Sequence, residues 1–140
     1  MRELILITVF ALCYILPVKA DAQKLRELVI AADDMGFIMA GRDTVGSENL
    51  DMYIRDRLIK SYMGTGQMYD KIRLEKLYGG PPATTMEVVI NEIKTGQQLA
   101  LRDLCLQKFS RRFEMLDKKK QTRLRKQFPV LFQNDYIISD

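Results

Sequence analysis

The 140-residue chain contains no histidine and no tryptophan, and it has only two cysteines. Histidine is the commonest general base near neutral pH and the commonest zinc ligand, so its absence excludes Ser-His-Asp and Cys-His catalytic sites. The only adjacent acidic pair, Asp33 and Asp34, is not expected to converge on one site, and no Gly-Lys-Ser/Thr phosphate loop occurs. We therefore expect a non-enzymatic protein without a cofactor or a metal.

Charge is absent from the thirteen residues Leu4–Leu16, which follow Arg2 and precede Pro17. This run is shorter than the about 20 apolar residues that a membrane span needs, and small residues follow it. The pattern is typical of a signal peptide over 1–22, with cleavage after either Ala20 or Ala22. An uncleaved anchor or a buried helix is the alternative. We expect a secreted, extracellular, non-transmembrane protein with a single helical domain over 23–140.

Cysteine is then too scarce for an internal disulfide. Cys13 leaves with the signal peptide, and Cys105 lies among Leu101, Leu104 and Leu106. A lone cysteine in such a setting is more often a small buried hydrophobic residue than an intermolecular bridge. The domain is expected to be held together by packing alone.

Helical periodicity is common in the first half of the chain. The segment Leu25–Ala40 is apolar around much of its circumference, which predicts a buried helix. Ser47 is a candidate N-cap for a second helix, and Thr65 for a third. The apolar positions that support these two helices are Leu50, Ile54, Leu58 and Tyr62 for the second, and Met68, Ile72 and Leu77 for the third.

The segment Tyr78–Pro82 (YGGPP) separates two helical halves. After it, Thr84–Glu87 fits a capping box, and Gly96 is expected to stop the helix that this box begins. A longer helix is expected to follow, and Asp117 is expected to cap the last one, which ends before Pro129. The apolar tail 130–138 is expected to lie back over the body. The prediction is an all-α fold, a compact bundle or wedge of five to seven amphipathic helices.

Positive charge is concentrated in one stretch. Residues 102–126 carry ten Lys or Arg and three Asp or Glu, a net charge of +7, whereas the whole chain carries +4. Such a concentration is typical of proteins that bind a polyanion or an anionic membrane. The aromatic residues of this stretch fall at helical spacing on the opposite face, where they are expected to be core. We therefore expect no specific nucleic-acid binding, and a solvated helix face is the simpler interpretation of the charge.

The apolar positions near the C-terminus form the pattern F-x-x-L-D-x6-L-x3-F-P, in which Phe113, Leu116–Asp117, Leu124 and Phe128–Pro129 are the defined positions. This pattern resembles the C-terminal signature of the nematode fatty-acid- and retinol-binding proteins. The segments 48–57 and 67–72 are similar to the central part of that family. The resemblance implies a wedge of amphipathic helices around an apolar cavity that holds fatty acids or retinoids.

Two functional hypotheses follow. The first is a secreted carrier of a fatty acid or retinoid, in which Lys108 and Arg112 bind the ligand carboxylate because they are four residues apart beside the Phe109/Phe113 stripe. The second is a cationic interaction protein that binds a polyanion or an anionic membrane surface through residues 102–126.

Overall fold

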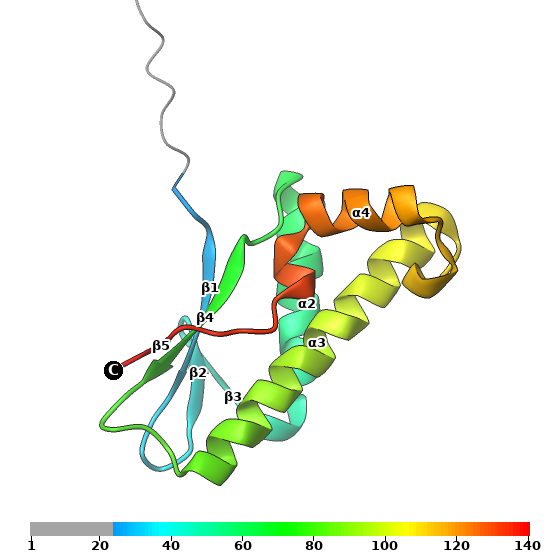
Figure 1. Cartoon of the computed structure of the whole chain (residues 1–140). Coiled ribbons are helices and arrows are strands. Elements are labelled where there is room, and N and C mark those ends of the chain that lie inside the picture. The colour runs from blue at the N-terminus through cyan, green and yellow to red at the C-terminus, as the bar shows by residue number, and fades with distance from the viewer. Residues whose placement is uncertain (1–23) are drawn as a thin grey trace, which may run out of the picture.

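The computed structural model describes residues 24–140 (Figure 1). The predicted signal peptide and its cleavage site lie outside these residues. The chain runs through the elements β1 (Glu27–Ala32), β2 (Ile38–Ala40), β3 (Asp43–Val45), the 3-10 helix η2 (Ser47–Asn49), α2 (Leu50–Thr65), β4 (Lys71–Lys76), α3 (Ala83–Phe109), η3 (Phe113–Met115), α4 (Lys118–Gln127), η4 (Pro129–Phe132) and β5 (Ile138–Ser139).

The strands form one mixed sheet in the order β3-β2-β1-β4-β5. Strands β1, β2 and β3 make an antiparallel meander, whereas β4 runs parallel to both β1 and β5. The parallel pairs need crossovers, which α2 provides between β3 and β4, and α3 with α4 between β4 and β5. Both edge strands are short, which limits pairing with other chains.

The core lies between one face of the sheet and the helices α2 and α3, which lie side by side to the right of the sheet in Figure 1. In β1 every second residue is buried, and in β4 the alternation holds for Ile72 and Leu74, as expected of strands with one covered face. These residues form one cluster with α2, α3 and the segment that follows α4. The largest fully buried members are Ile30, Ile38, Leu50, Ile54, Leu58, Ile72, Leu74, Ile93, Leu104, Val89 and Val130.

The all-α prediction is wrong, because the first half of the domain contains four of the strands. The predicted helix Leu25–Ala40 is the hairpin β1–β2, whose turn depends on Gly36 at φ 84° and on the Asp33 carboxylate. That carboxylate accepts hydrogen bonds from the backbone N–H groups of Met35 and Phe37. The predicted third helix is strand β4, in which Ile72 and Leu74 are buried and the intervening charged residues are half-buried. The domain is therefore a mixed α/β domain.

The helices of the second half also differ from the prediction. Gly96 does not end a helix, and α3 is one continuous helix of 27 residues. Its N-cap is Pro82, and no side chain caps it, so the predicted capping box does not form. Gly96 lies where α3 crosses α2: a Cβ at this position would lie 2.6 Å from the backbone oxygen of Asp51. Glycine thus permits the close approach of two helices.

Three local predictions are confirmed. Leu50, Ile54 and Leu58 are buried on one face of α2. Asp117 caps α4, and its side chain accepts a hydrogen bond of 2.9 Å from the Lys120 backbone N–H. Leu124 and Phe128 are buried, and the helix ends before Pro129. Cys105 is fully buried as well, and burial raises the pKa of its thiol.

Candidate anion-binding surface

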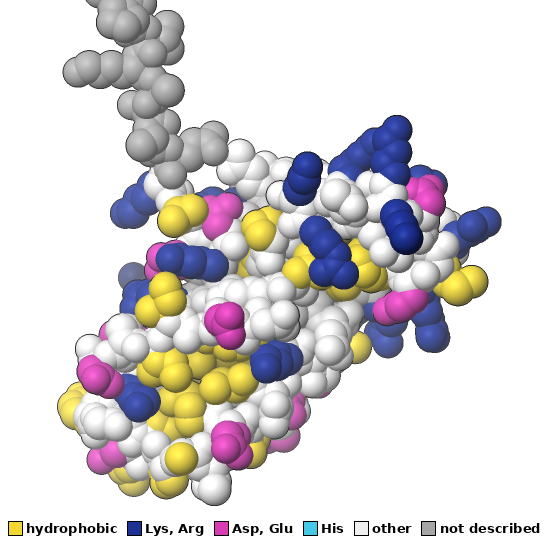
Figure 2. Space-filling model, viewed as in Figure 1, with side chains coloured by type: hydrophobic (Ala, Val, Ile, Leu, Met, Phe, Trp, Pro, Cys, Tyr) yellow, Lys and Arg dark blue, Asp and Glu magenta, His cyan; other side chains and the backbone are white. Residues whose placement is uncertain are grey.

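The basic residues of 102–126 lie on the last turns of α3, on η3 and its flanking residues, and on α4. All ten side chains are exposed. Figure 2 shows Lys and Arg side chains gathered at the upper right, over α4 and the adjoining end of α3, with few acidic groups among them. We call this region the basic surface. Its members are Arg102, Lys108, Arg111, Arg112, Lys118, Lys119, Lys120, Arg123, Arg125 and Lys126.

The basic surface is poorly neutralised by the protein itself. Within residues 24–140, Arg102 pairs with Asp103 at 3.5 Å and Lys120 pairs with Asp117 at 3.8 Å, and its other members make no ion pair. The sheet shows the opposite behaviour. Glu27 accepts from both Lys71, at 3.1 Å, and Arg73, at 2.9 Å, and these two bonds hold the pKa of Glu27 below its usual value. Positive charge is thus left uncompensated at one end of the molecule.

Aromatic rings hold several of these cations in place. The Lys108 ammonium lies over Tyr62 at 5.1 Å and over Phe128 at 5.3 Å, and Lys120 lies over Phe109 at 5.5 Å. Such contacts stabilise a cation over the face of a ring by about 0.5–1 kcal/mol at exposed sites. They also restrict where the charge can move, so part of the basic surface is pre-organised.

The predicted pair Lys108 and Arg112 does not share a helix face. Helix α3 ends at Phe109, and Ser110 adopts the left-handed conformation with φ 55°, so the spacing of four residues has no helical meaning there. Lys108 lies over rings of α2 and of the end of α4, whereas Arg112 lines a groove on another side of α3. Their role toward a ligand carboxylate stays a prediction.

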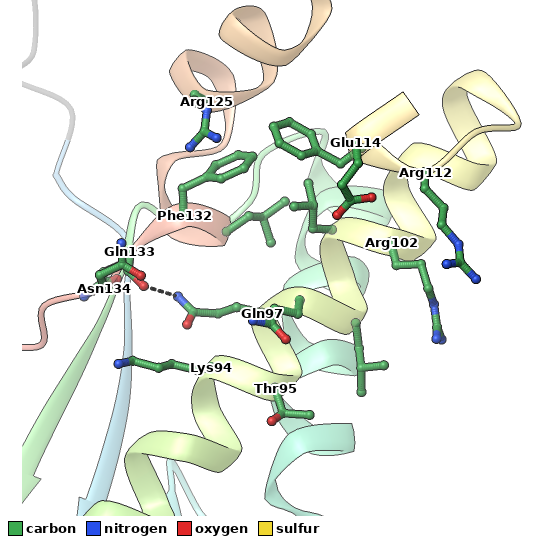
Figure 3. Close-up of a pocket in the computed structure, with 15 residues that line it drawn as sticks. Lys94, Thr95, Gln97, Arg102, Arg112, Glu114, Arg125, Phe132, Gln133 and Asn134 are labelled. Carbon is green, nitrogen blue, oxygen red and sulfur yellow. Dashed lines mark hydrogen bonds between the residues drawn. The ribbon is translucent and has the colours of Figure 1, made fainter. Parts of the chain in front are cut away.

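The groove that Arg112 lines has a volume of about 730 Å³ and lies between α3 and the chain that follows α4 (Figure 3). Helix α3 contributes one wall, and Leu131–Asn134 contribute the other. Residues next to or within η3, together with Arg125 of α4, lie at its upper end in Figure 3. The lining residues are Lys94, Thr95, Gln97, Gln98, Leu99, Leu101, Arg102, Arg112, Phe113, Glu114, Arg125, Leu131, Phe132, Gln133 and Asn134.

The Arg125 guanidinium is stacked at this end of the groove. Its central carbon lies 4.7 Å from the centre of the Phe132 ring and 5.2 Å from that of Phe113, and the two rings are 5.2 Å apart. A stacked guanidinium leaves its N–H groups free in the plane, where they can bind a carboxylate with two parallel hydrogen bonds. No ion pair uses these groups within residues 24–140.

A buried polar network fixes the opposite wall. Gln97 is 2% exposed, and its amide donates to the Val130 carbonyl at 2.6 Å and to the Gln133 carbonyl at 3.3 Å. The Tyr136 hydroxyl donates to the Gln97 side-chain oxygen at 2.5 Å. The Gln133 side chain accepts from the N–H of Ile72 and donates to its C=O, each at 2.8 Å, and so extends the hydrogen bonding of β4 before its pairing with β5 begins. The tail is therefore held firmly against α3 and the sheet.

The sequence did not indicate that Lys94, Gln97 and Gln133 line a groove, and it did not predict the stacking of Arg125 on two rings. Gln97 had one usable signal, a polar residue four positions after the buried Ile93 on the same helix face. The stacking of Arg125 joins α4, η3 and η4, and no local spacing predicts it.

No protein-family model, curated protein or solved structure matches this chain. The part of the chain that the structure describes contains no helix long and apolar enough to cross a membrane. Within the same residues, no group of three or more His, Cys, Asp or Glu side chains is arranged to hold a metal ion. The basic surface and its groove are the features from which a function is argued.

Proposed function

We propose that this protein is a non-enzymatic binding module that attaches to a polyanionic partner through the basic surface. The observation that supports the proposal is the accumulation of ten exposed cations on α4 and the end of α3, of which only Arg102 and Lys120 each form an ion pair within residues 24–140. Uncompensated like charges repel one another in the free protein, and an anionic partner relieves that repulsion. Aromatic stacking under Lys108, Lys120 and Arg125 lowers the entropy lost on binding.

This surface is better suited to binding a polyanion than to inserting into the headgroup region of a membrane. The sequence of α4, KKKQTRLRKQ, has a single large apolar residue, and that residue, Leu124, is buried. A helix that inserts into a membrane interface needs an exposed apolar face, which α4 lacks.

The carrier hypothesis stays a prediction, but the fold that it expects is not the one observed. The resemblance to the fatty-acid- and retinol-binding proteins implies an all-α wedge, and the domain instead has a five-stranded sheet. Four of the pattern positions, Leu116, Leu124, Phe128 and the half-buried Phe113, belong to or pack against the core. Their spacing is explained by the packing of α4 and η3. Lipid carriage, like secretion, stays a prediction.

The proposed function predicts salt-dependent binding to heparin, a polyanion. The logarithm of the binding constant should fall linearly with the logarithm of the salt concentration, because each neutralised anion releases a counterion. Replacing Lys118 and Lys119 by Gln should weaken binding and lower the slope by about 1 for each lost contact. Isothermal titration calorimetry at several salt concentrations measures both quantities.

A matched control removes the same charge from the sheet side of the molecule, with Arg42→Gln and Lys76→Gln. This variant should bind heparin almost as the parent protein does. An equal loss in both variants would show that net charge, and not the basic surface, drives binding. Adsorption to vesicles of anionic phospholipid without heparin binding would replace the polyanion by a membrane surface.

A further inference from the structure

The groove between α3 and the tail presents cations at separated points. Lys94 lies at one end, beside Gln133 and Asn134, and Arg102 lies toward the other, as Figure 3 shows. Both residues belong to α3 and are eight positions apart, so their backbone positions are separated by about 12 Å along the helix axis. An extended peptide covers that distance in about four residues, since a strand rises about 3.3 Å per residue.

Apolar side chains lie between the charged ends of the groove. Leu101 of α3 is half-buried, and Leu131 and Phe132 form part of the opposite wall. The Gln97 amide is fully engaged with the tail, so it supports the wall without offering a free donor. A ligand that fits the groove therefore combines an apolar centre with anionic ends.

The Glu114 side chain enters the groove from η3 (Figure 3). A carboxylate at the end of the groove that carries Arg102 and Arg112 disfavours a ligand with continuous negative charge, such as a chain of phosphates, because part of that charge would lie close to it. It accepts a ligand whose negative groups are spaced apart. The groove therefore selects for spaced negative groups, whereas Lys118 and Lys119 on the outer side of α4 do not.

We propose that the groove binds an extended segment of a partner protein in which two acidic residues, four positions apart, flank an apolar residue. Alternate side chains of an extended chain point the same way, so the pattern is acidic–x–apolar–x–acidic. One carboxylate contacts Lys94, the apolar side chain packs on Leu131 and Phe132, and the other carboxylate binds the guanidinium groups at the opposite end. The inference rests on the proposed function and names the chemistry of the partner.

The test uses two fluorescein-labelled nine-residue peptides, one with Glu-Gly-Leu-Gly-Glu at its centre and one with Gln-Gly-Leu-Gly-Gln. Fluorescence anisotropy should show binding of the Glu peptide, with affinity at least about tenfold higher than that of the Gln peptide. Lys94→Gln should reduce binding of the Glu peptide several-fold, while heparin binding changes little. Arg125→Gln should reduce binding of the Glu peptide several-fold and weaken heparin binding as well, because Arg125 belongs to the basic surface. Lys118→Gln with Lys119→Gln should weaken heparin binding and leave peptide binding unchanged.

Arg125 also packs against two rings, so its replacement is compared with Lys94→Gln, whose side chain makes no cation–π contact within residues 24–140. Thermal unfolding checks that both variants fold. Equal affinity for the two peptides, binding that the groove variants do not change, or no peptide binding by a protein that still binds heparin would overturn the inference and leave the proposed function intact. No binding of either heparin or the Glu peptide by the parent protein would overturn both.

Discussion

At the scale of single residues, Tyr136 and Gln97 decide how firmly the tail is attached. Burial raises the pKa of the Tyr136 phenol to about 12, and its hydroxyl donates to the buried Gln97 amide. A phenolate in this place would lose the donated proton and would be poorly solvated. The neutral form of Tyr136 is therefore part of the folded state.

This pKa gives a prediction for alkaline pH. The native phenol keeps its proton up to about pH 12, whereas an unfolded tyrosine loses it near pH 10. The stabilisation that this group contributes is therefore complete below pH 10, and it is lost as the pH rises from about 10 to about 12. Urea unfolding of the parent protein and of Tyr136→Phe across this range should show a steeper decline for the parent protein.

The Tyr136→Phe variant is expected to be less stable at neutral pH, because the Gln97 oxygen loses its donor, by about 1–3 kcal/mol. The two curves should then converge as the pH rises. Parallel curves would mean that Tyr136 does not titrate with unfolding. All other groups are common to both proteins, so their effects cancel in the comparison.

At the scale of elements, the crossing of α2 and α3 depends on glycine at position 96, which has no side chain. A Cβ on Gly96 would lie 2.6 Å from the Asp51 oxygen and 2.7 Å from the Ile54 Cβ, so the helices would have to move apart. Buried residues of both helices share one core with those of the sheet, and α3 also carries one wall of the groove. A small displacement at the crossing therefore affects the core and the groove together.

Gly96→Ala should destabilise the domain by about 1–3 kcal/mol, because overpacking outweighs the better helix propensity of alanine. Gly64 provides the control, since it also lies in a helix, α2, and a Cβ there would meet no atom within 4 Å. Gly64→Ala should leave stability unchanged or raise it by up to about 1 kcal/mol. Thermal unfolding of the pair checks this, and equal effects would contradict the close approach of the two helices.

The elements also differ in how far the sequence predicts them. Helices α2 and α4 are governed by local features, a stripe at steps of four and an Asp cap, and both were predicted. The sequence of strand β4, KIRLEK, alternates between apolar and charged residues as a strand does. Met68 and Ile72 are also four residues apart, as in a helix, and this spacing led to the wrong prediction of a helix. Strand β1 lies in a continuous apolar run, in which periodicity does not separate a strand from a buried helix.

The candidate site was predicted only in part, for a related reason. The charge of residues 102–126 is a property of composition, and the sequence shows it directly. The groove depends on contacts between α3 and residues about 30 positions later, such as Gln97 with Val130 and Gln133. Long-range contacts of this kind follow from the tertiary fold, and the fold had been predicted as all-α.

At the scale of the whole molecule, charge is distributed unevenly. The acidic residues outside 102–126 outnumber the basic ones, so the sheet end is mildly negative while the basic surface carries +7. Self-repulsion on such a surface lowers the stability of the folded state, and it does so most at low salt. The same charges attract an anionic partner, which is consistent with a binding role.

Substitutions at two positions of α4 distinguish the effect of charge on stability from its effect on binding. Lys119 and Lys126 are both exposed and are seven residues apart, so they lie on the same face of the helix. Lys119 lies in the first turn, where the helix dipole disfavours a cation, and Lys126 lies in the last turn, where the dipole favours one. Replacing either by Glu lowers the charge of the same surface by the same amount, because a negative charge takes the place of a positive one.

Both Lys119→Glu and Lys126→Glu should therefore weaken heparin binding to a similar degree. Their stabilities should differ: Lys119→Glu should stabilise the domain by about 0.3–1 kcal/mol at low salt, relative to Lys126→Glu, and added salt should reduce the difference. Urea unfolding at low and high salt, beside heparin titration, measures both. A destabilised Lys119→Glu variant that still binds heparin would show that the first-turn lysines serve the fold, and the basic surface would then lose its place as the binding site.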